Sequence, residues 1–235
     1  MSAPLHQLLD YRPPADAGLD VCYEDEALLV INKPGGLLSV PGRGPLMADC
    51  LVSRVQLRYP DALIVHRLDL PTSGLIVLAR GPETQRRMST LFQDRLVDKT
   101  YTAVVAGTLA SDAGEVNLPL ITDWPQRPRQ KVDLSAGKPA LTRWRVLERR
   151  ADAAEAEAWG EHLATTRVAL TPVTGRSHQL RVHMMSLGHP IVGDPMYASE
   201  AVRAQASRLL LHASHLCFAH PLSGQTVQVE SVAPF

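Results

Sequence analysis

The sequence predicts an α+β fold in which a mixed, mostly antiparallel central sheet carries flanking helices. Short apolar runs of strand length recur along the 235 residues, and turn signals rich in Gly and Pro separate them. The runs follow one another in hairpin-like order, without a regular alternation of strand and helix. With 45% apolar and 20% charged residues, the chain is long enough and apolar enough to bury a sizeable core.

Local patterns predict the elements of the first hundred residues. Residues 1–20 contain three prolines and few apolar anchors, so we expect a loose arm there and one two-lobed domain over residues 21–235. An apolar stripe at helical spacing that ends at Pro60 predicts one helix, and Pro82 suits the first turn of another. We expect strands at 28–31, 63–65 and 75–79, and helices at 47–58 and 82–96.

The second half of the chain is expected to be richer in strands. Residues 141–147 alternate so that Thr142, Trp144 and Val146 share one face. Ser177 is the expected N-cap of a helix that ends before Gly188. The acidic, Ala-rich segment 151–160 is interpreted as a solvated hairpin loop. We expect strands at 101–106, 115–118, 141–147, 164–170, 209–219 and 225–230, and a helix at 177–187.

The formal net charge of zero conceals an uneven distribution. Residues 1–26 contain six acids and one base, and residues 151–161 contain four acids and no base. The rest of the chain therefore has 23 bases against 14 acids. We expect a basic face that includes residues 120–150, Arg67 and Arg181, with the acids on the opposite side.

Several classes of protein are excluded or disfavoured. No apolar run approaches the roughly 18 residues of a membrane helix, and the N-terminus does not resemble a secretory signal. Three scattered cysteines predict neither a disulfide framework nor a zinc site, and they suit the reducing cytoplasm. His212-x-x-His215 lacks a Cys or Glu partner at useful spacing, so we expect no metal. No glycine-rich nucleotide loop is present, so we expect no nucleotide cofactor.

The stretch HRLDLPTSG at 66–74 places His66, Arg67 and Asp69 between two apolar runs. Such residues lie at the mouth of a sheet, where the backbone is fixed but side chains reach solvent. A carboxylate there can act as nucleophile, base or acid. Alternatively, Asp69 caps its own turn, and Arg67 makes an ordinary surface ion pair.

The stretch TGRSHQLRVH at 174–183 combines a polar stripe with an adjacent apolar one at helical spacing. His178 and Arg181 share one face, and Leu180 lies on the next. An arginine in this setting can hold a carboxylate in a partly buried site. A solvated basic face is the alternative.

Two further features are typical of contacts with RNA. Tyr101 at a strand entrance can be a core residue or a stacking platform for a base. Residues 120–150 contain eight bases and three acids, interleaved with Trp124 and Trp144. Arginines and lysines beside aromatic rings suit RNA with exposed bases, whereas a mixed-charge surface hairpin is the plain alternative.

Together these pieces are more specific than any one of them. The run HRLDLPTSGLIVLAR at 66–80 resembles the signature of the RluA family of RNA pseudouridine synthases, in which the Asp is catalytic. The resemblance continues with INKPGGLLSVPGR at 31–43 and GRSHQLRVHMMSLGHPIVGD at 175–194. The stretches NLPLITDWPQRPRQKV, GKPA and YASEAVRAQASRLLLHA resemble short bacterial members of the family. The resemblance implies the catalytic fold of that family, with an active-site cleft between two lobes and without an N-terminal S4 RNA-binding domain.

The resemblance also implies roles at matching positions. Asp69 would be the nucleophile, Arg181 would pair with it, and Tyr101 would stack on the uracil. Arg67, with His66 beside it, would fill the gap left by the flipped nucleotide, and Leu180 would line the uracil pocket. Further RNA contacts are expected from basic side chains near these motifs: Lys33, Arg127, Arg129, Lys131, Lys138, Arg176 and His178.

The implied activity is an isomerisation of specific uridines, which needs no cofactor because nothing is oxidised and no group is imported. The implied partners are structured RNAs, namely the tRNA anticodon stem-loop and a hairpin of large-subunit ribosomal RNA. We expect a monomer in the cytoplasm that binds no membrane. An N-glycosidase acting on RNA or nucleosides and a non-catalytic RNA-binding assembly factor stay open as alternatives.

Overall fold

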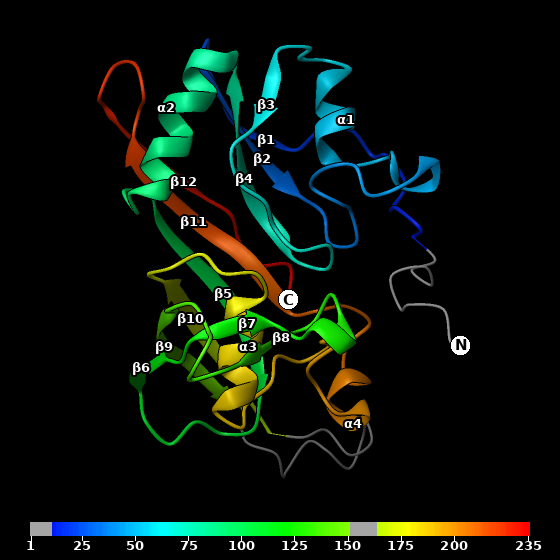
Figure 1. Cartoon of the computed structure of the whole chain (residues 1–235), viewed down its shortest axis with the longest axis vertical. Coiled ribbons are helices and arrows are strands. Elements are labelled where there is room, and N and C mark those ends of the chain that lie inside the picture. Colours follow the sequence, from blue (N-terminus) through cyan, green and yellow to red (C-terminus); the bar gives the residue numbers. More distant parts are fainter. Residues whose placement is uncertain (1–10, 151–163) are drawn as a thin grey trace. The chain divides into compact units, whose positions relative to one another are not determined.

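The computed structural model describes residues 11–150 and 164–235, and it forms two compact units. In the described part, unit 1 comprises Tyr101–Leu211, and unit 2 comprises Tyr11–Thr100 with His212–Phe235. The chain passes from one unit to the other within strands β5 (Asp98–Ala106) and β11 (Leu211–Ala219) (Figure 1).

Unit 2 is built on a sheet in which one long strand pairs with several others. β4 (Ser73–Arg80) pairs antiparallel with β2 (Leu28–Lys33) and β3 (Ala62–Ile64), and it pairs in parallel with the start of β11. β1 (Val21–Glu24) extends the sheet beside β2, and β12 (Thr226–Glu230) pairs antiparallel with β11. These pairings confirm the mixed, mostly antiparallel sheet that the sequence predicts.

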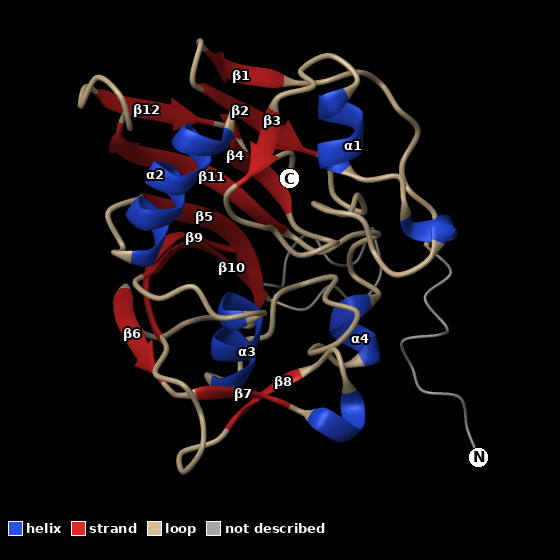
Figure 2. Cartoon of the chain, turned by 45° about the horizontal axis from the view of Figure 1, so that its top comes forward, coloured by secondary structure: helices blue, strands red, loops and turns tan. Residues whose placement is uncertain are grey.

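Two helices flank the sheet of unit 2. α2 (Pro82–Gln93) lies on β3 and β4, as Figure 2 shows, and α1 (Leu51–Gln56) contacts β3. α2 begins at Pro82 as expected, but it ends before residue 96 because Arg95 takes a left-handed φ of 62°. The helix expected at 47–58 is shorter because a 3₁₀ turn occupies Pro45–Met47 and Cys50 is extended.

A glycine makes the parallel contact in unit 2 possible. Gly74 has a φ of 111°, and a Cβ at this position would lie 2.4 Å from both the N and the O of Ala213. Only glycine tolerates this backbone conformation and approach, so β4 can pair with β11 directly after the turn that contains Asp69. Ser73, beside it, hydrogen-bonds His212 Nδ1 at 2.9 Å, which fastens the end of that turn to β11.

Unit 1 contains an antiparallel sheet and a small hairpin. β10 (Thr165–Pro172) pairs with β5 and with β9 (Leu141–Arg150), and β6 (Ala113–Asn117) pairs with β9. β7 (Leu120–Thr122) and β8 (Gln130–Val132) form the hairpin, with a 3₁₀ turn at Trp124–Gln126 between them. α3 (Gln179–Ser186) packs on β8, β9 and β10, and α4 (Glu200–Arg203) follows it.

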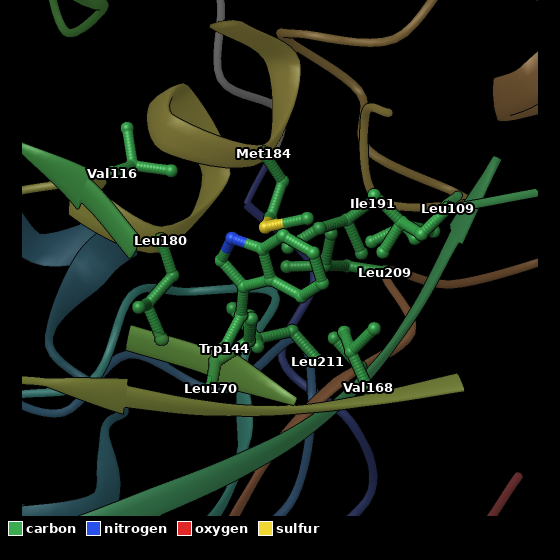
Figure 3. Close-up of a cluster of buried hydrophobic side chains, with 12 residues drawn as sticks. Leu109, Val116, Trp144, Val168, Leu170, Leu180, Met184, Ile191, Leu209 and Leu211 are labelled. Carbon is green, nitrogen blue, oxygen red and sulfur yellow. The ribbon is translucent and has the colours of Figure 1, made fainter. Parts of the chain in front are cut away.

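The core of unit 1 lies between its sheet and α3. Figure 3 shows the indole of Trp144 among Leu170 from β10 and Leu180 and Met184 from α3. Thr142 and Trp144 are buried while the arginines at positions 143 and 145 are exposed, which confirms the alternation expected along 141–147. This core fixes α3, which carries the candidate site residues Leu180 and Arg181.

The outcome differs for the expected N-cap of α3, the expected N-terminal arm and the expected acidic loop. The N-cap expected at Ser177 is wrong, because α3 begins at Gln179 after His178 takes a left-handed φ of 54°. Residues 11–20 contain no helix or strand, but the hydroxyl of Tyr11 donates to the carbonyl of Asp49, which ties this part of the arm down. Residues 1–10 and the acidic segment lie outside the described residues. No helix in the described part is long and apolar enough to span a membrane.

Candidate active site

Asp69 lies in the loop between β3 and β4 of unit 2, where hydrogen bonds hold the main chain beside it. The hydroxyl of Ser39 donates to the carbonyl of Leu68 (2.9 Å) and accepts from the N–H of the same residue (3.2 Å). The N–H of Thr72 donates to the main-chain carbonyl of Asp69 (3.1 Å), which closes the turn without using the carboxylate. The backbone therefore presents a half-buried carboxylate from a fixed position.

The residue after Asp69 is held from the other side by the loop that follows β2. The carbonyl of Leu70 accepts from the N–H of Gly36 (2.9 Å) and from Nζ of Lys33 (3.4 Å). The same ammonium donates to the carbonyls of Pro34 and Leu37, and the side chain of Lys33 is fully buried. Lys33 thus holds two loops together, which differs from the RNA contact expected of it.

Loss of the Ser39 hydroxyl is expected to misplace Asp69. In Ser39→Ala, the buried N–H and C=O of Leu68 lose a partner, which costs about 1–3 kcal/mol of the free energy of unfolding. A shift of the carboxylate by about 1 Å is expected to lower kcat of a reaction at Asp69 by about a hundredfold, while KM for the substrate stays within about threefold. Steady-state kinetics check this, and Ser39→Thr, which keeps the hydroxyl, is expected to restore kcat. Equal losses in kcat for the Ala and Thr variants would contradict the positioning role.

His66 and Arg67, in the same loop, are placed differently from each other. Nε2 of His66 accepts the N–H of Val77 at 3.0 Å, and its ring stacks on Phe92 with centroids 4.3 Å apart. Burial, with a smaller effect of the Lys99 charge, lowers the pKa of His66 to about 3. His66 is therefore a neutral residue that secures the loop to β4 and α2, and the RNA contact expected of it stays a prediction. Arg67 is exposed, as a residue that reaches for RNA must be.

The lowered pKa of His66 predicts a loss of stability in mild acid. In the unfolded chain His66 takes up a proton near pH 6.5, whereas the folded protein resists protonation down to about pH 3. The stabilising contribution is therefore complete above pH 6.5 and is lost as the pH falls toward 3. It amounts to about 2 kcal/mol between pH 7.5 and pH 5.

Urea unfolding at these two pH values, on the natural chain and on His66→Gln, measures this contribution. The variant cannot titrate at position 66, so its free energy of unfolding is expected to fall by about 2 kcal/mol less. An identical pH dependence in the two proteins would show that His66 is protonated equally in the folded and unfolded states.

In unit 1, Arg181 of α3 forms a buried ion pair with Asp194. Nε of Arg181 lies 2.8 Å from Oδ2 of Asp194, and Nη2 lies 2.8 Å from Oδ1. The two side chains are 1% and 0% exposed. Asp194 Oδ1 also accepts the N–H groups of Met196 and Tyr197. The solvated basic face is therefore excluded for α3, and the expectation that Arg181 belongs to a basic surface is wrong.

Tyr197 connects this ion pair to the hairpin of β7 and β8. Its ring lies 5.0 Å from the guanidinium carbon of Arg181, and 5.2 Å from that of Arg129. Its hydroxyl accepts the N–H of Gln130 (2.8 Å) and lies 2.7 Å from Nδ1 of His178. Burial raises the pKa of Tyr197, so the hydroxyl remains protonated at neutral pH. The guanidinium of Arg181 is thus held by a carboxylate at its edge and a ring at its face.

The remaining predicted site residues of unit 1 fall into two groups. Tyr101 is half-buried against the core, and Leu180 is 7% exposed within that core. Arg176 is half-buried and donates from Nε to the carbonyl of Pro139. The other basic residues expected to contact RNA are exposed on the hairpin and the chain that follows it, namely Arg127, Lys131 and Lys138.

Asp194, Tyr197 and Ser39 have clear roles in the structure that the sequence did not assign to them. One signal was available for Asp194, because it is the first acid after Glu161 along the chain. If Arg181 is buried in the helix expected at 177–187, Asp194 is therefore the acid nearest to it in sequence that could pair with it. No comparable signal marks Ser39, since its contact with Leu68 spans 29 residues.

Each unit carries side chains that can take part in catalysis. Unit 2 presents a carboxylate on a clamped turn, with an exposed arginine two residues before it. Unit 1 presents a rigidly held guanidinium, a half-buried tyrosine and an apolar core residue beside it. A carboxylate can act covalently on a nucleoside, and a tyrosine ring can stack on a base. Among the described residues, no cluster of three or more His, Cys, Asp or Glu side chains could hold a metal.

Comparison with known proteins identifies the class to which this fold and these residues belong. The family model described as RNA pseudouridylate synthase matches residues 27–186, which include the Asp69 loop, Tyr101 and α3. The chain therefore belongs to the RNA pseudouridylate synthase family and is an isomerase that acts on RNA.

Individual relatives are similar over nearly the whole chain. The dual-specificity RNA pseudouridine synthase RluA of Vibrio parahaemolyticus is 50% identical over 216 residues, covering 92% of this chain and 84% of the relative. The protein of the same name from Escherichia coli K12 is 47% identical over 226 residues, covering 96% and 98%. The solved structure of human RNA pseudouridylate synthase domain containing 1 superimposes with a TM-score of 0.76 at 29% identity, covering 95% of this chain and 87% of that one.

Proposed function

We propose that this enzyme converts specific uridines to pseudouridine in two classes of RNA, the tRNA anticodon stem-loop and a hairpin of large-subunit ribosomal RNA. The observation that carries this proposal is the 47–50% identity to relatives named dual-specificity RNA pseudouridine synthase, over 92–96% of the chain. The motifs 117–132, 137–140 and 197–213 add support, because they resemble the short bacterial members of the family.

The proposed chemistry breaks one bond and makes one within the same nucleotide. The N1–C1′ glycosidic bond of the uridine breaks, the uracil turns, and C5 bonds to C1′ while N1 gains a proton and C5 loses one. Asp69 acts as the nucleophile that opens the reaction, Arg181 keeps this carboxylate ionised and oriented, and Tyr101 stacks on the uracil. Leu180 lines the pocket for the base, and Arg67 fills the space that the flipped nucleotide leaves.

This mechanism requires Asp69 of unit 2 and Arg181 of unit 1 to act on one nucleotide. We further propose that the enzyme works as a monomer in the cytoplasm. Its three cysteines are free thiols, Cys50 among them buried, which suits a reducing compartment.

The substrate assignment is tested by mapping pseudouridines in RNA from a strain that lacks this gene. The proposal expects a site in the anticodon stem-loop of one or more tRNAs and a site in the large-subunit ribosomal RNA to be lost together. Both sites are expected to return when the natural chain is supplied. Loss of sites in one RNA class alone would refute the dual specificity and leave the isomerase activity intact.

The affinity for substrate RNA is expected to fall as the salt concentration rises, with a slope set by the small number of phosphates that the enzyme contacts. A plot of log Kd against log salt gives that number, and Lys131→Gln on the exposed face of β8 should lower the slope by about one. Because a phosphate contact reads no sequence, the variant should weaken binding to all RNAs alike. A Kd that does not change with salt would refute the role of the basic hairpin.

A further inference from the structure

Trp124 is placed unusually for an aromatic residue in this chain. The protein has three Trp, five Tyr and three Phe, and Trp144 is buried in the core of unit 1. Trp124, by contrast, is 66% exposed. Among the described residues, the other large apolar side chains that are exposed are leucines and a valine. Exposing an indole forfeits the free energy of burying it, so its position calls for an explanation in terms of a contact made outside the chain.

The turn that carries Trp124 is well defined. The N–H of Asp123 donates to the carbonyl of Arg129 (2.9 Å), and the N–H of Gln126 donates back to the carbonyl of Asp123 (2.9 Å). The N–H of Arg129 closes the turn on the carbonyl of Gln126 (3.0 Å). The indole is therefore displayed by a turn with its own hydrogen bonds, so presenting it costs little conformational entropy on binding.

The base of the hairpin is anchored in the interior of unit 1. Val132 of β8 packs on the cluster that contains Val182 of α3 and Tyr197. The main chain of Gln130 is tied to the Tyr197 hydroxyl, the same residue whose ring lies against Arg181. The hairpin and the arginine of the proposed active site thus share one rigid support within unit 1.

Charge around the indole indicates the kind of partner. The guanidinium carbon of Arg127 lies 4.4 Å from the centroid of the Trp124 ring, so the arginine occupies one face of the indole. Arg129 and Lys131 follow on the same hairpin, against a single acid, Asp123. An exposed ring flanked by cations is the combination that binds unpaired nucleobases together with their phosphates.

We propose that Trp124 and Arg127 form a stacking platform for an unpaired base of the substrate RNA, a base other than the uridine that reacts. The base stacks on the open face of the indole, and Arg127, Arg129 and Lys131 contact the adjoining phosphates. The platform selects RNA with an unstacked loop over fully paired RNA, because paired bases present no free face. This inference rests on the proposed function, since it presumes that RNA is the substrate.

Binding measurements on two RNAs test the platform. The probes are a hairpin with a seven-nucleotide loop that contains uridine, and a fully paired RNA duplex of equal length. Trp124→Ala is expected to weaken binding to the hairpin by about tenfold and to change binding to the duplex by less than about twofold. Trp124→Phe keeps an aromatic face and is expected to bind the hairpin within about threefold of the natural chain. Leu134→Ala, which removes another exposed apolar side chain shortly after β8, is the matched control and should leave both affinities unchanged.

Fluorescence provides an independent readout. The emission of Trp124 is obtained as the difference between the emission of the natural chain and that of Trp124→Phe. Adding the hairpin RNA is expected to quench this emission. Equal affinities of Trp124→Ala and Leu134→Ala for the hairpin would overturn the proposal, as would an equal loss on the duplex. Both outcomes are read from binding alone, so they differ from a failure of the proposed function, which would show as absence of pseudouridine with the natural chain.

Discussion

Asp69→Asn is expected to reduce pseudouridine formation by at least about ten-thousandfold, the scale seen when an enzyme loses its nucleophile. The substitution keeps the size of the side chain and leaves the hydrogen bonds to Leu68, Leu70 and the Asp69 carbonyl in place, because these use the main chain. The fold and the RNA-binding surfaces should therefore survive. We expect the Kd for substrate RNA to stay within about threefold, since the contacts that supply affinity lie elsewhere.

Single-turnover assays with excess enzyme, together with Kd measurements on the same RNA, separate the two effects. Asp94→Asn is the matched control, because Asp94 is an exposed aspartate of the same unit at the end of α2. It should match the natural chain in both measurements. Near-normal turnover by Asp69→Asn would remove Asp69 from the mechanism, and the loop motif would then have to be explained as structure alone.

The second large effect is expected at the buried ion pair of unit 1. Arg181→Met leaves the carboxylate of Asp194 uncompensated at 0% exposure, which should lower the free energy of unfolding by about 3–5 kcal/mol. Under the proposed mechanism, loss of the guanidinium should also lower turnover by about a hundred- to a thousandfold. A loss of turnover alone does not separate these two roles, because a destabilised enzyme also loses activity.

A double variant separates them. Arg181→Met combined with Asp194→Asn removes the uncompensated charge, while the Asn carbonyl still accepts the N–H groups of Met196 and Tyr197. The free energy of unfolding, measured in urea, should then recover most of the loss, but turnover should stay low. Recovery of turnover together with stability would show that Arg181 serves folding and has no part in the reaction.

Elements whose sequence pattern reflects one buried face could be predicted. Residues 141–147 alternate because β9 buries Thr142 and Trp144 on the core side, and Pro82 starts α2 because it suits a first turn. Ends of elements depended on tertiary contacts that no local pattern contains. The left-handed His178 delays the start of α3, and its ring nitrogen meets Tyr197, which is 19 residues away.

The candidate site shows the same division. Motifs singled out Asp69, Arg67 and Arg181 as candidates, because each lies within a short and specific run of residues. What those side chains touch was not predictable, since the partners come from distant parts of the chain. Lys33 was expected at the RNA, but charge alone does not reveal burial, and the structure uses this residue to hold two loops together. Asp194 was present in a recognised motif, yet its pairing with Arg181 emerged only from the fold.

A pseudouridine synthase rearranges a uridine without releasing its base, which distinguishes it from an N-glycosidase. Purified natural chain, incubated with hairpin RNA that carries 5-tritiated uridine, measures this directly. We expect tritium to appear in water, because C5 gives up its hydrogen when it bonds to C1′, and we expect no free uracil, because the base of the modified nucleotide stays in the RNA as pseudouridine. Free tritiated uracil without tritiated water would identify an N-glycosidase instead. RNA that binds but releases neither would identify a non-catalytic binding protein, and either result would contradict the account.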